Sequence, residues 1–363
     1  MFESIRPYLD SEIPAAMQRM AADPVFPVVC RYLFPERPVA EVADELRGCR
    51  STEDFQRRFM YPAVYAVARK TTTSFTTSGL EALDPGKSYL FVSNHRDIVM
   101  DAAFLQVLLL DAGLRTSEIT FGANLMQGDF VVDFGRSNKM FRVERPTTVA
   151  SSREFLRKSQ ELSEYLRYTL LEKGESVWIA QRNGRTKDGR DATDPGIVKM
   201  FGMAGPIEEL NIVPMAVSYE WEPCDVLKAA ELTALAAAGH YEKKPGEDLQ
   251  SILTGILQPK GGVHITAGKP LTEADFAPLR TLPRNAYNRA VAALIDERIH
   301  AAYRLWPSNL VAADLLEGSS RGGYTPEQKA AFEAHLQTAP EALRPLLVSI
   351  YAGPALAVRP KTE

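Results

Sequence analysis

Short apolar segments alternate with longer helical patterns through the middle of the chain, and this alternation restricts the possible folds more than any other feature. Each apolar segment is only a few residues long and is bounded by polar or turn-forming residues, which is typical of a buried strand. The predicted strands are 88–93, 118–121, 140–143, 176–180, 212–218 and 262–267. Strands that alternate with helices predict an α/β fold, in which helices flank a largely parallel central sheet.

Helical periodicity occurs between the predicted strands and at both ends of the chain. Capping sequences open two of these helices, Ser51-Thr52-Glu53-Asp54 before one and Ser151 with Glu154 before another, which continues to Gly174. Further helices are expected at 101–112, 197–203 and from Arg284 onward. We therefore predict a helical N-terminal region 1–70, an α/β domain 71–317 and a helical C-terminal tail 318–363, with the linker at Gly318–Gly323.

Composition excludes several classes of protein. The chain has 363 residues, 45% hydrophobic and 24% charged, as in an ordinary soluble globular protein. Its longest uncharged stretch, 345–358, contains two prolines and a glycine and is shorter than the roughly 20 residues of a membrane-spanning helix. Three cysteines without metal-ligand spacing, and an N-terminus without the pattern of a signal peptide, indicate a cytoplasmic protein.

The charge is unevenly distributed. The net charge of −4, from 42 basic and 46 acidic residues, argues against a nucleic-acid-binding protein. Between Arg136 and Arg190, however, thirteen Lys and Arg residues face seven Asp and Glu residues, a local charge of +6. This basic segment is either a site for an anion or an anionic surface, or a solvated helix face.

Chemically active side chains follow three of the predicted strands. Ligands of α/β sheets bind beyond the carboxyl ends of the strands. His95, Asp97 and Asp101 follow the first strand, Glu144 and Arg145 follow another, and the loop 181–189 follows a third. One edge of the sheet would thus collect a histidine, carboxylates, arginines and a glycine-containing loop.

This set of side chains suits proton transfer beside an anion. Neutral histidine takes a proton from an alcohol when a carboxylate, here Asp101 or Asp97, holds its other ring nitrogen. Arginine binds phosphate through its planar, permanently charged guanidinium. A histidine near an aspartate is common by chance and single arginines are usually surface residues, so the combination carries the prediction. The sequence has no G-x-S-x-G, Walker A or G-x-G-x-x-G motif and no zinc-ligand spacing.

Four blocks of these residues resemble the glycerolipid acyltransferase superfamily, which includes glycerol-3-phosphate and 1-acylglycerol-3-phosphate acyltransferases. The blocks are SNHRDIVMD, MFRVER, WIAQRNGRTKDG and IVPMAVSYE, and the likeness extends from Thr71 to Leu316 through GVHITAGKPL and the segment 295–316. Two departures stand out. Five residues, not four, separate His95 from Asp101. Either the loop has an additional residue, or Asp97 is the carboxylate that partners the histidine. We favour Asp101, which directly precedes the apolar helix. The glutamate of the third block is replaced by Asn183.

The resemblance implies transfer of a fatty acyl group from acyl-CoA or acyl carrier protein to the hydroxyl of a glycerol-phosphate or lysophosphatidate-type acceptor in phospholipid biosynthesis. His95 would be the general base and Asp101 its partner. The residues expected to bind the substrate are Arg145, Arg185, Arg142, Arg182, Asn183 and Gly184. No metal, resident cofactor or covalent acyl-enzyme is implied.

The acceptor and the activity leave alternatives open. Asn183 motivates a different lysolipid acceptor, such as a lyso-aminolipid, and the altered His–Asp spacing motivates a non-catalytic lipid-binding protein. A lipid acceptor implies peripheral binding to the inner face of the cell membrane, for which the helical N-terminus and the basic segment are candidates.

Overall fold

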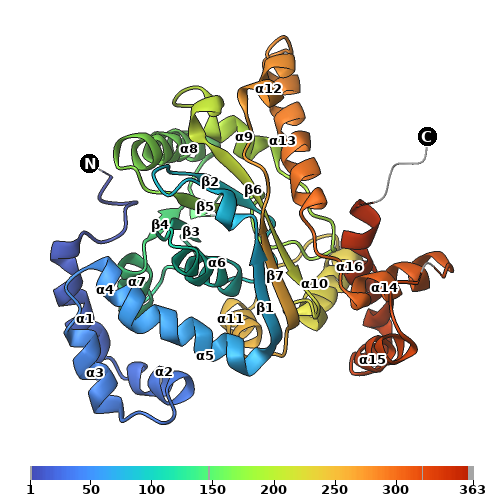
Figure 1. Cartoon of the computed structure of the whole chain (residues 1–363), viewed down its shortest axis with the longest axis horizontal. Coiled ribbons are helices and arrows are strands. Elements are labelled where there is room, and N and C mark those ends of the chain that lie inside the picture. Colours follow the sequence, from blue (N-terminus) through green and yellow to red (C-terminus); the bar gives the residue numbers. More distant parts are fainter. Residues whose placement is uncertain (1, 146–147, 321, 359–363) are drawn as a thin grey trace.

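The centre of the molecule is a seven-stranded sheet with the strand order β1-β7-β6-β2-β5-β3-β4 and helices on both faces (Figure 1). The structure, a computed structural model, describes residues 2–145, 148–320 and 322–358. The strands are β1 (Thr72–Ser78), β2 (Leu90–Ser93), β3 (Glu118–Gly122), β4 (Met140–Val143), β5 (Val177–Ala180), β6 (Ile212–Tyr219) and β7 (Gly261–Ala267). The expected α/β fold with a largely parallel sheet is confirmed: five neighbouring strand pairs are parallel, and β6 with β7 is antiparallel.

All six predicted strands are present, with ends that differ from the prediction by at most two residues. The strand β1 was not predicted, because its sequence TTSFTTS has no apolar run and only Phe75 packs against the core. It is an edge strand, paired with β7 alone, so polar side chains on it remain in contact with solvent. The antiparallel direction of β7 was also not predicted.

The predicted helices of the central domain are α6 (Met100–Asp111), α8 (Ser152–Arg167), α9 (Pro195–Phe201) and α13 (Arg284–Ala301). The helix expected to reach Gly174 changes at Tyr168 into a π-helical turn, Tyr168–Glu172. Ser151 caps α8, since its hydroxyl accepts the Glu154 backbone N–H at 3.1 Å. The helices α7 (Asp129–Ser137), α10 (Asp225–Ala238), α11 (Glu247–Leu257) and α12 (Glu273–Phe276) were not predicted.

Two apolar cores lie on the two faces of the sheet. On one face, α5 (Tyr61–Thr71) and α6 pack against side chains such as Phe91 and Val263. On the other face, α8, α9 and α13 pack against side chains such as Val92 and Phe141. The strands β2 and β6 are buried along their whole length, as expected of central strands covered on both sides.

The N-terminal residues are helical, as predicted. They form α1 (Ile13–Ala22), α2 (Phe26–Leu33), α3 (Val39–Arg47), α4 (Thr52–Phe55), a π-helical turn (Gln56–Met60) and α5. The segment before α1 runs beside the edge strand β4, where the Arg142 backbone N–H donates to the Ile5 carbonyl at 3.1 Å. This contact covers part of an otherwise open sheet edge.

The C-terminal helices α14 (Pro307–Glu317), α15 (Pro326–Gln337) and α16 (Arg344–Ala357) form a separate apolar core with Ala229 of α10. Helix α14 therefore packs with the tail although it precedes the predicted boundary at residue 318. The division into three regions stays a prediction, and residues 321 and 359–363 of the predicted tail lie outside the described residues.

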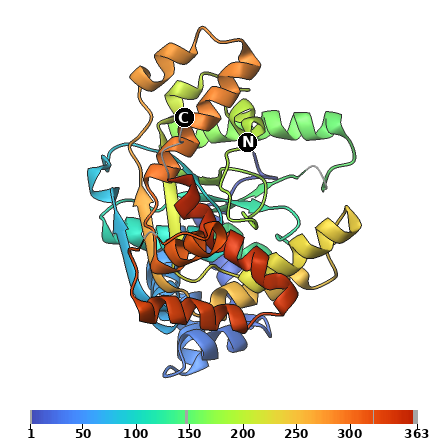
Figure 2. The same ribbon diagram turned by 90° about the vertical axis from the view of Figure 1, so that its right-hand side faces the viewer.

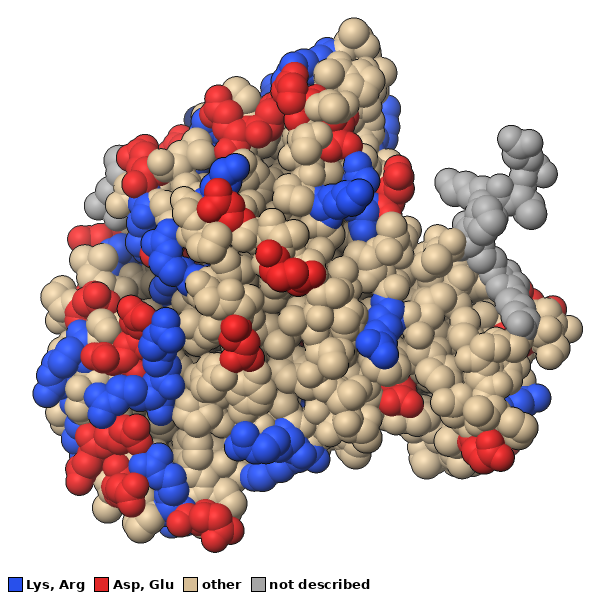
Figure 3. Space-filling model, in the orientation of Figure 1, with Lys and Arg blue, Asp and Glu red and all other residues tan. Residues whose placement is uncertain are grey.

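Several cations of the basic segment 136–190 are paired with acidic side chains, three of which belong to the segment itself. In the described part of the chain, the following ion pairs use its cations: Lys139–Glu175, Arg142–Glu144, Lys158–Glu161, Arg167–Glu209, Lys173–Glu118 and Lys187–Glu231. The face in Figure 3 likewise shows both signs of charge interspersed over the N-terminal helices and few charges over β1 and β7. The local excess of +6 is thus not a uniform positive surface.

Helix α16 approaches the loop after β5 so closely that only glycine fits. A Cβ built on Gly353 would lie 2.0 Å from the Gly189 carbonyl oxygen, which is a backbone atom and cannot move aside alone. We predict that Gly353→Ala lowers the free energy of unfolding by about 1–3 kcal/mol, measured by urea denaturation. The matched control is Gly135→Ala in α7, where the nearest atom is 3.4 Å away and helix propensity predicts a gain of up to about 1 kcal/mol. Equal stability changes in the two variants would contradict the close contact.

Candidate active site

His95 lies in the loop that connects the carboxyl end of β2 to α6. Its side chain is 13% exposed, and its Nδ1 is 2.9 Å from Oδ2 of Asp101 in the first turn of α6. The edge of the Trp178 ring packs beside the imidazole, with 5.5 Å between ring centroids. When Nδ1 carries the proton and donates it to Asp101, Nε2 is the nitrogen that can accept a proton from another group.

Asp101 is fully buried and both its oxygens are occupied. Oδ2 accepts the backbone N–H groups of Arg96 at 2.6 Å and Asp97 at 2.9 Å, in addition to its contact with His95. Oδ1 accepts the hydroxyl of Tyr219 at 2.7 Å. This carboxylate is therefore a fixed acceptor behind the imidazole, the position that orients a general base.

Asp97 has a different role in the same loop. Its Oδ1 accepts the backbone N–H groups of Val99 and Met100 and so caps the start of α6. Burial, together with the charge of Asp101, raises the pKa of Asp97. Its Oδ2 has no hydrogen-bond partner among the described residues and faces Gly255 of α11, where a Cβ would lie 2.0 Å from it. Of the two carboxylates, the structure brings Asp101 to the imidazole, across the five-residue spacing.

Arg145 and Arg185 lie close to each other beside this loop. Burial lowers the pKa of Arg145, and the positive charge of Arg185 acts in the same direction. The Arg145 guanidinium packs against Gly122 at the end of β3, and Nη1 of Arg185 is buried without an acceptor among the described residues. The Asp248 carboxylate acts on Arg145 in the opposite direction, and the charge of Arg185 acts on the buried Asp97. The two cations nevertheless repel each other, and a bound anion would reduce this repulsion.

The other predicted substrate-binding residues are less involved. Arg142 is exposed on the edge strand β4 and pairs with Glu144 at 2.8 Å. Arg182 is half-buried, Asn183 is exposed, and Gly184 has a φ of +76° with open space beside its Cα. Arg182, Asn183 and Gly184 belong to the turn 181–190. This turn contacts the histidine loop through another residue, since the Thr186 backbone N–H donates to the His95 carbonyl at 2.8 Å.

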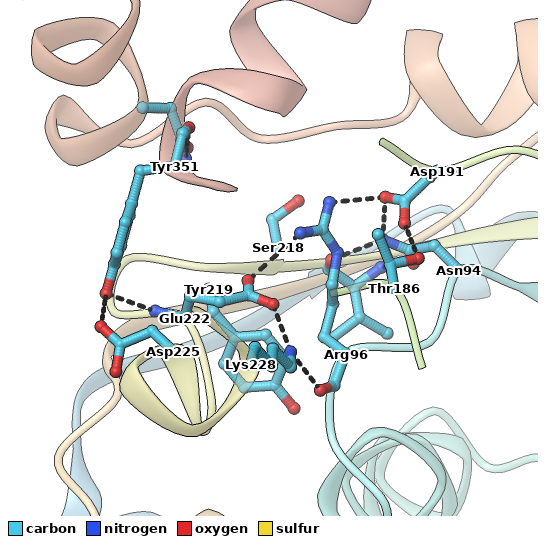
Figure 4. Close-up of polar contacts among 12 residues, drawn as sticks. Asn94, Arg96, Thr186, Asp191, Ser218, Tyr219, Glu222, Asp225, Lys228 and Tyr351 are labelled. Atoms are coloured by element: carbon cyan, nitrogen blue, oxygen red, sulfur yellow. Dashed lines mark hydrogen bonds and ion pairs between the residues drawn. The ribbon is translucent and has the colours of Figure 1, made fainter. Parts of the chain in front are cut away.

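A buried ion network that the sequence analysis did not predict holds the residue next to His95. The Arg96 guanidinium donates to Asp191 at 2.6 Å and to Glu222 at 3.2 Å (Figure 4). Lys228 donates to Glu222 at 2.5 Å and to the Arg96 carbonyl at 2.7 Å. Burial opposes the charge of Arg96, but the charges of Asp191 and Glu222 outweigh it and keep the Arg96 pKa well above its ordinary value.

The network extends to the C-terminal helices. The Tyr351 hydroxyl on α16 accepts the Glu222 backbone N–H at 3.0 Å and donates to Asp225 at 2.8 Å (Figure 4). The sequence offered only one signal for these residues, the arginine directly after His95. Asp191, Glu222 and Lys228 are spread over distant segments without a motif spacing.

Comparison with known protein families gives a match to one segment of the chain. Residues 74–218 match the family model of the acyltransferases, and this segment contains His95, Asp101, Arg145 and Arg185. The matched segment is an acyltransferase domain, in agreement with the resemblance noted in the sequence. The family match ends one residue before Tyr219.

Among solved structures, the crystal structure of the 1-acyl-sn-glycerophosphate (LPA) acyltransferase PlsC from Thermotoga maritima is similar to this chain. The similarity covers 78% of this chain and 94% of that chain, with 15% sequence identity and a TM-score of 0.39. The comparison with curated proteins gives no sequence match.

The two aspartates of the histidine loop are expected to respond differently to an amide. Asp101→Asn should lower kcat by about 10²–10⁴-fold, because it removes the charge that stabilises the imidazolium. Asp97→Asn keeps the oxygen that caps α6 and should leave kcat within about threefold of the wild type. Loss of activity in Asp97→Asn with retention in Asp101→Asn would reverse the two roles.

Stability against pH gives a second measurement on Asp97→Asn. The pKa of Asp97 is raised above 3.8 in the folded protein, so the wild type loses stability as the pH rises through the interval between the unfolded and folded values. The variant should therefore be more stable than the wild type near neutral pH, and this advantage should disappear below about pH 4. Urea denaturation at several pH values measures both.

Proposed function

We propose that this domain transfers a fatty acyl group from a thioester, acyl-CoA or acyl carrier protein, to the hydroxyl of a glycerol-phosphate or lysophosphatidate-type acceptor. The observation that carries the proposal is the contact of His95 with Asp101 close to the paired guanidinium groups of Arg145 and Arg185. This combination supports a proton acceptor and an anion-binding position at the same edge of the sheet.

The proposed reaction is direct acyl transfer. His95 Nε2 takes the proton of the acceptor hydroxyl while that oxygen attacks the thioester carbonyl carbon, and Asp101 stabilises the imidazolium. The tetrahedral intermediate then breaks its C–S bond, and the leaving thiolate takes the proton from His95. The products are an ester and a free thiol, with no acyl group on the protein.

The acceptor phosphate is proposed to bind between Arg145 and Arg185, whose guanidinium groups suit bidentate contact with phosphate oxygens. Arg182, Asn183 and Gly184 are proposed to border this position from the turn 181–190, and Arg142 to contribute only long-range charge. Asn183 supports a lysolipid with another headgroup as the alternative acceptor, because an exposed amide hydrogen-bonds a polar headgroup without a charge of its own.

Substitution of His95 tests the chemistry. His95→Ala should lower kcat by about 10²–10⁴-fold without loss of fold, in an assay with labelled acyl-CoA and acyl-carrier-protein donors. The acceptors are glycerol 3-phosphate, lysophosphatidate and a lyso-aminolipid. The control is His240→Ala, which removes an exposed histidine. Unchanged turnover in His95→Ala would exclude the mechanism, and lipid binding without turnover by any donor–acceptor pair would favour a non-catalytic lipid-binding protein.

We further propose that the protein works on the inner face of the cell membrane. None of the helices in the described residues has both the length and the apolar character needed to cross a bilayer. Helix α11 instead exposes Leu249, Leu253 and Leu257, which are 59%, 48% and 51% accessible and line a shallow groove. Its opposite side packs on Asp97 through Gly255, so the helix has an apolar outer face beside the site.

A second candidate membrane contact lies in the basic segment. Arg153, Leu156 and Arg157, in the first turns of α8, line another groove, and the two cations would favour an anionic headgroup layer. In Figure 2, α8 (green) and α10 (yellow), which leads to α11, extend toward the same side of the sheet. Both grooves are therefore proposed to face the bilayer that supplies the lipid acceptor.

Vesicle flotation tests the membrane contact. The wild type should float with vesicles that contain phosphatidylglycerol at low salt, and the triple variant Leu249→Ser/Leu253→Ser/Leu257→Ser should bind at least about tenfold more weakly. The control is Leu315→Ser/Leu316→Ser on α14, which removes two leucines of similar exposure from the C-terminal helices. Absence of wild-type binding at low salt would remove the proposed location.

A further inference from the structure

Tyr219, the last residue of β6, contacts the carboxylate that orients His95. The ring is 5% exposed, and the hydroxyl lies 2.7 Å from Oδ1 of Asp101. The predicted site and the family match both omit this residue. Among the described residues, Tyr219 is the one hydrogen-bond partner of Oδ1 of Asp101, whereas Oδ2 has three partners.

The sheet places Tyr219 under the histidine loop. Ser93, the last residue of β2, pairs with Met215, so β6 continues four residues further than its neighbour. The side chain of Asn94 extends this pairing, since it accepts the Val217 N–H at 2.7 Å and donates to the Val217 carbonyl at 3.0 Å. The loop is thus fastened along β6, and the Tyr219 hydroxyl meets Asp101 where the strand ends.

We infer that Tyr219 is a positioning residue of the acyl transfer proposed above, and that it acts through Asp101. A carboxylate rotates about its terminal torsion unless both oxygens are held. The backbone donors hold Oδ2 toward His95, and Tyr219 holds Oδ1 away from it. Without this hydroxyl, Oδ1 is buried without a donor, and the carboxylate is free to turn away from the imidazole.

The hydroxyl acts as a permanent donor. Burial and the charge of Asp101 raise the pKa of Tyr219 well above its ordinary value, so the hydroxyl stays protonated at every pH at which the enzyme would be assayed. It donates to Oδ1 of Asp101, whereas His95 contacts Oδ2 of the same carboxylate. Tyr219 therefore does not transfer the proton of the reaction.

A double-mutant cycle tests this role. Tyr219→Phe should lower kcat/KM about tenfold, mainly through kcat. The acid limb of its pH profile should move to lower pH by about half a unit to one unit, because a carboxylate that has turned away stabilises the imidazolium less. In the Asp101→Asn background, the same substitution should cause no further loss, because its effect passes through the missing carboxylate.

The matched control is Tyr165→Phe. Tyr165 is also buried and donates to a buried carboxylate, Glu118, at 2.5 Å, but at the amino end of β3. This variant should lose stability without any shift of the pH profile. The midpoint of the pH profile does not depend on the amount of folded enzyme. It therefore distinguishes a positioning role from a structural role even where Tyr219→Phe lowers the folded fraction.

Two results would overturn the inference: an unchanged pH profile in Tyr219→Phe, or an equal loss of activity in the wild-type and Asp101→Asn backgrounds. An inactive wild type would instead refute the proposed function. In that case the role of Tyr219 is tested without turnover, by the low-field NMR resonance of the His95 Nδ1–H proton. This resonance is assigned by its absence in His95→Gln. It should move in Tyr219→Phe and not in Tyr165→Phe, and an unmoved resonance would also overturn the inference.

Discussion

The ion pairs of Arg96 with Asp191 and Glu222 are the interaction on which the rest of the site depends. Transfer of a charged side chain out of water costs several kcal/mol for each ion, so Arg96 is tolerated only with both carboxylates in place. These carboxylates come from the segments after β5 and after β6, whereas Arg96 follows β2. Three strand ends must therefore assemble together, and His95 is fixed as the neighbour of the residue that joins them.

This constraint gives the C-terminal helices a part in the site although they are far from it in sequence. Tyr351 of α16 holds the backbone of Glu222, and Gly353 packs directly on Gly189 of the loop that contains Asp191. The two partners of Arg96 are thus supported from the same helix. The tail is a component of the packing around the histidine loop rather than a separate appendage.

The sequence predicted those features that depend on local patterns. Apolar runs identified the six buried strands, and the position of Asp101 before an apolar helix identified it over Asp97 as the neighbour of His95. The strand β1 was missed because an edge strand needs no apolar alternation, and α11 was missed because its leucines face outward. Tyr219 and Glu222 could not be predicted, since their contacts depend on how far β6 extends beyond β2, a property of the register and not of any segment alone.

The antiparallel direction of β7 has a consequence for the chain between β6 and β7. Because these strands are antiparallel neighbours, the chain leaves and re-enters the sheet at the same edge, and the segment with α10 and α11 needs no crossover connection. The connection between α10 and α11, residues 239–246, can therefore change in length without rethreading the sheet, whereas Lys228 of α10 and Gly255 of α11 are held by their contacts with the histidine loop. Tolerance of insertions at this end of the sheet is thus confined to the connection between the two helices.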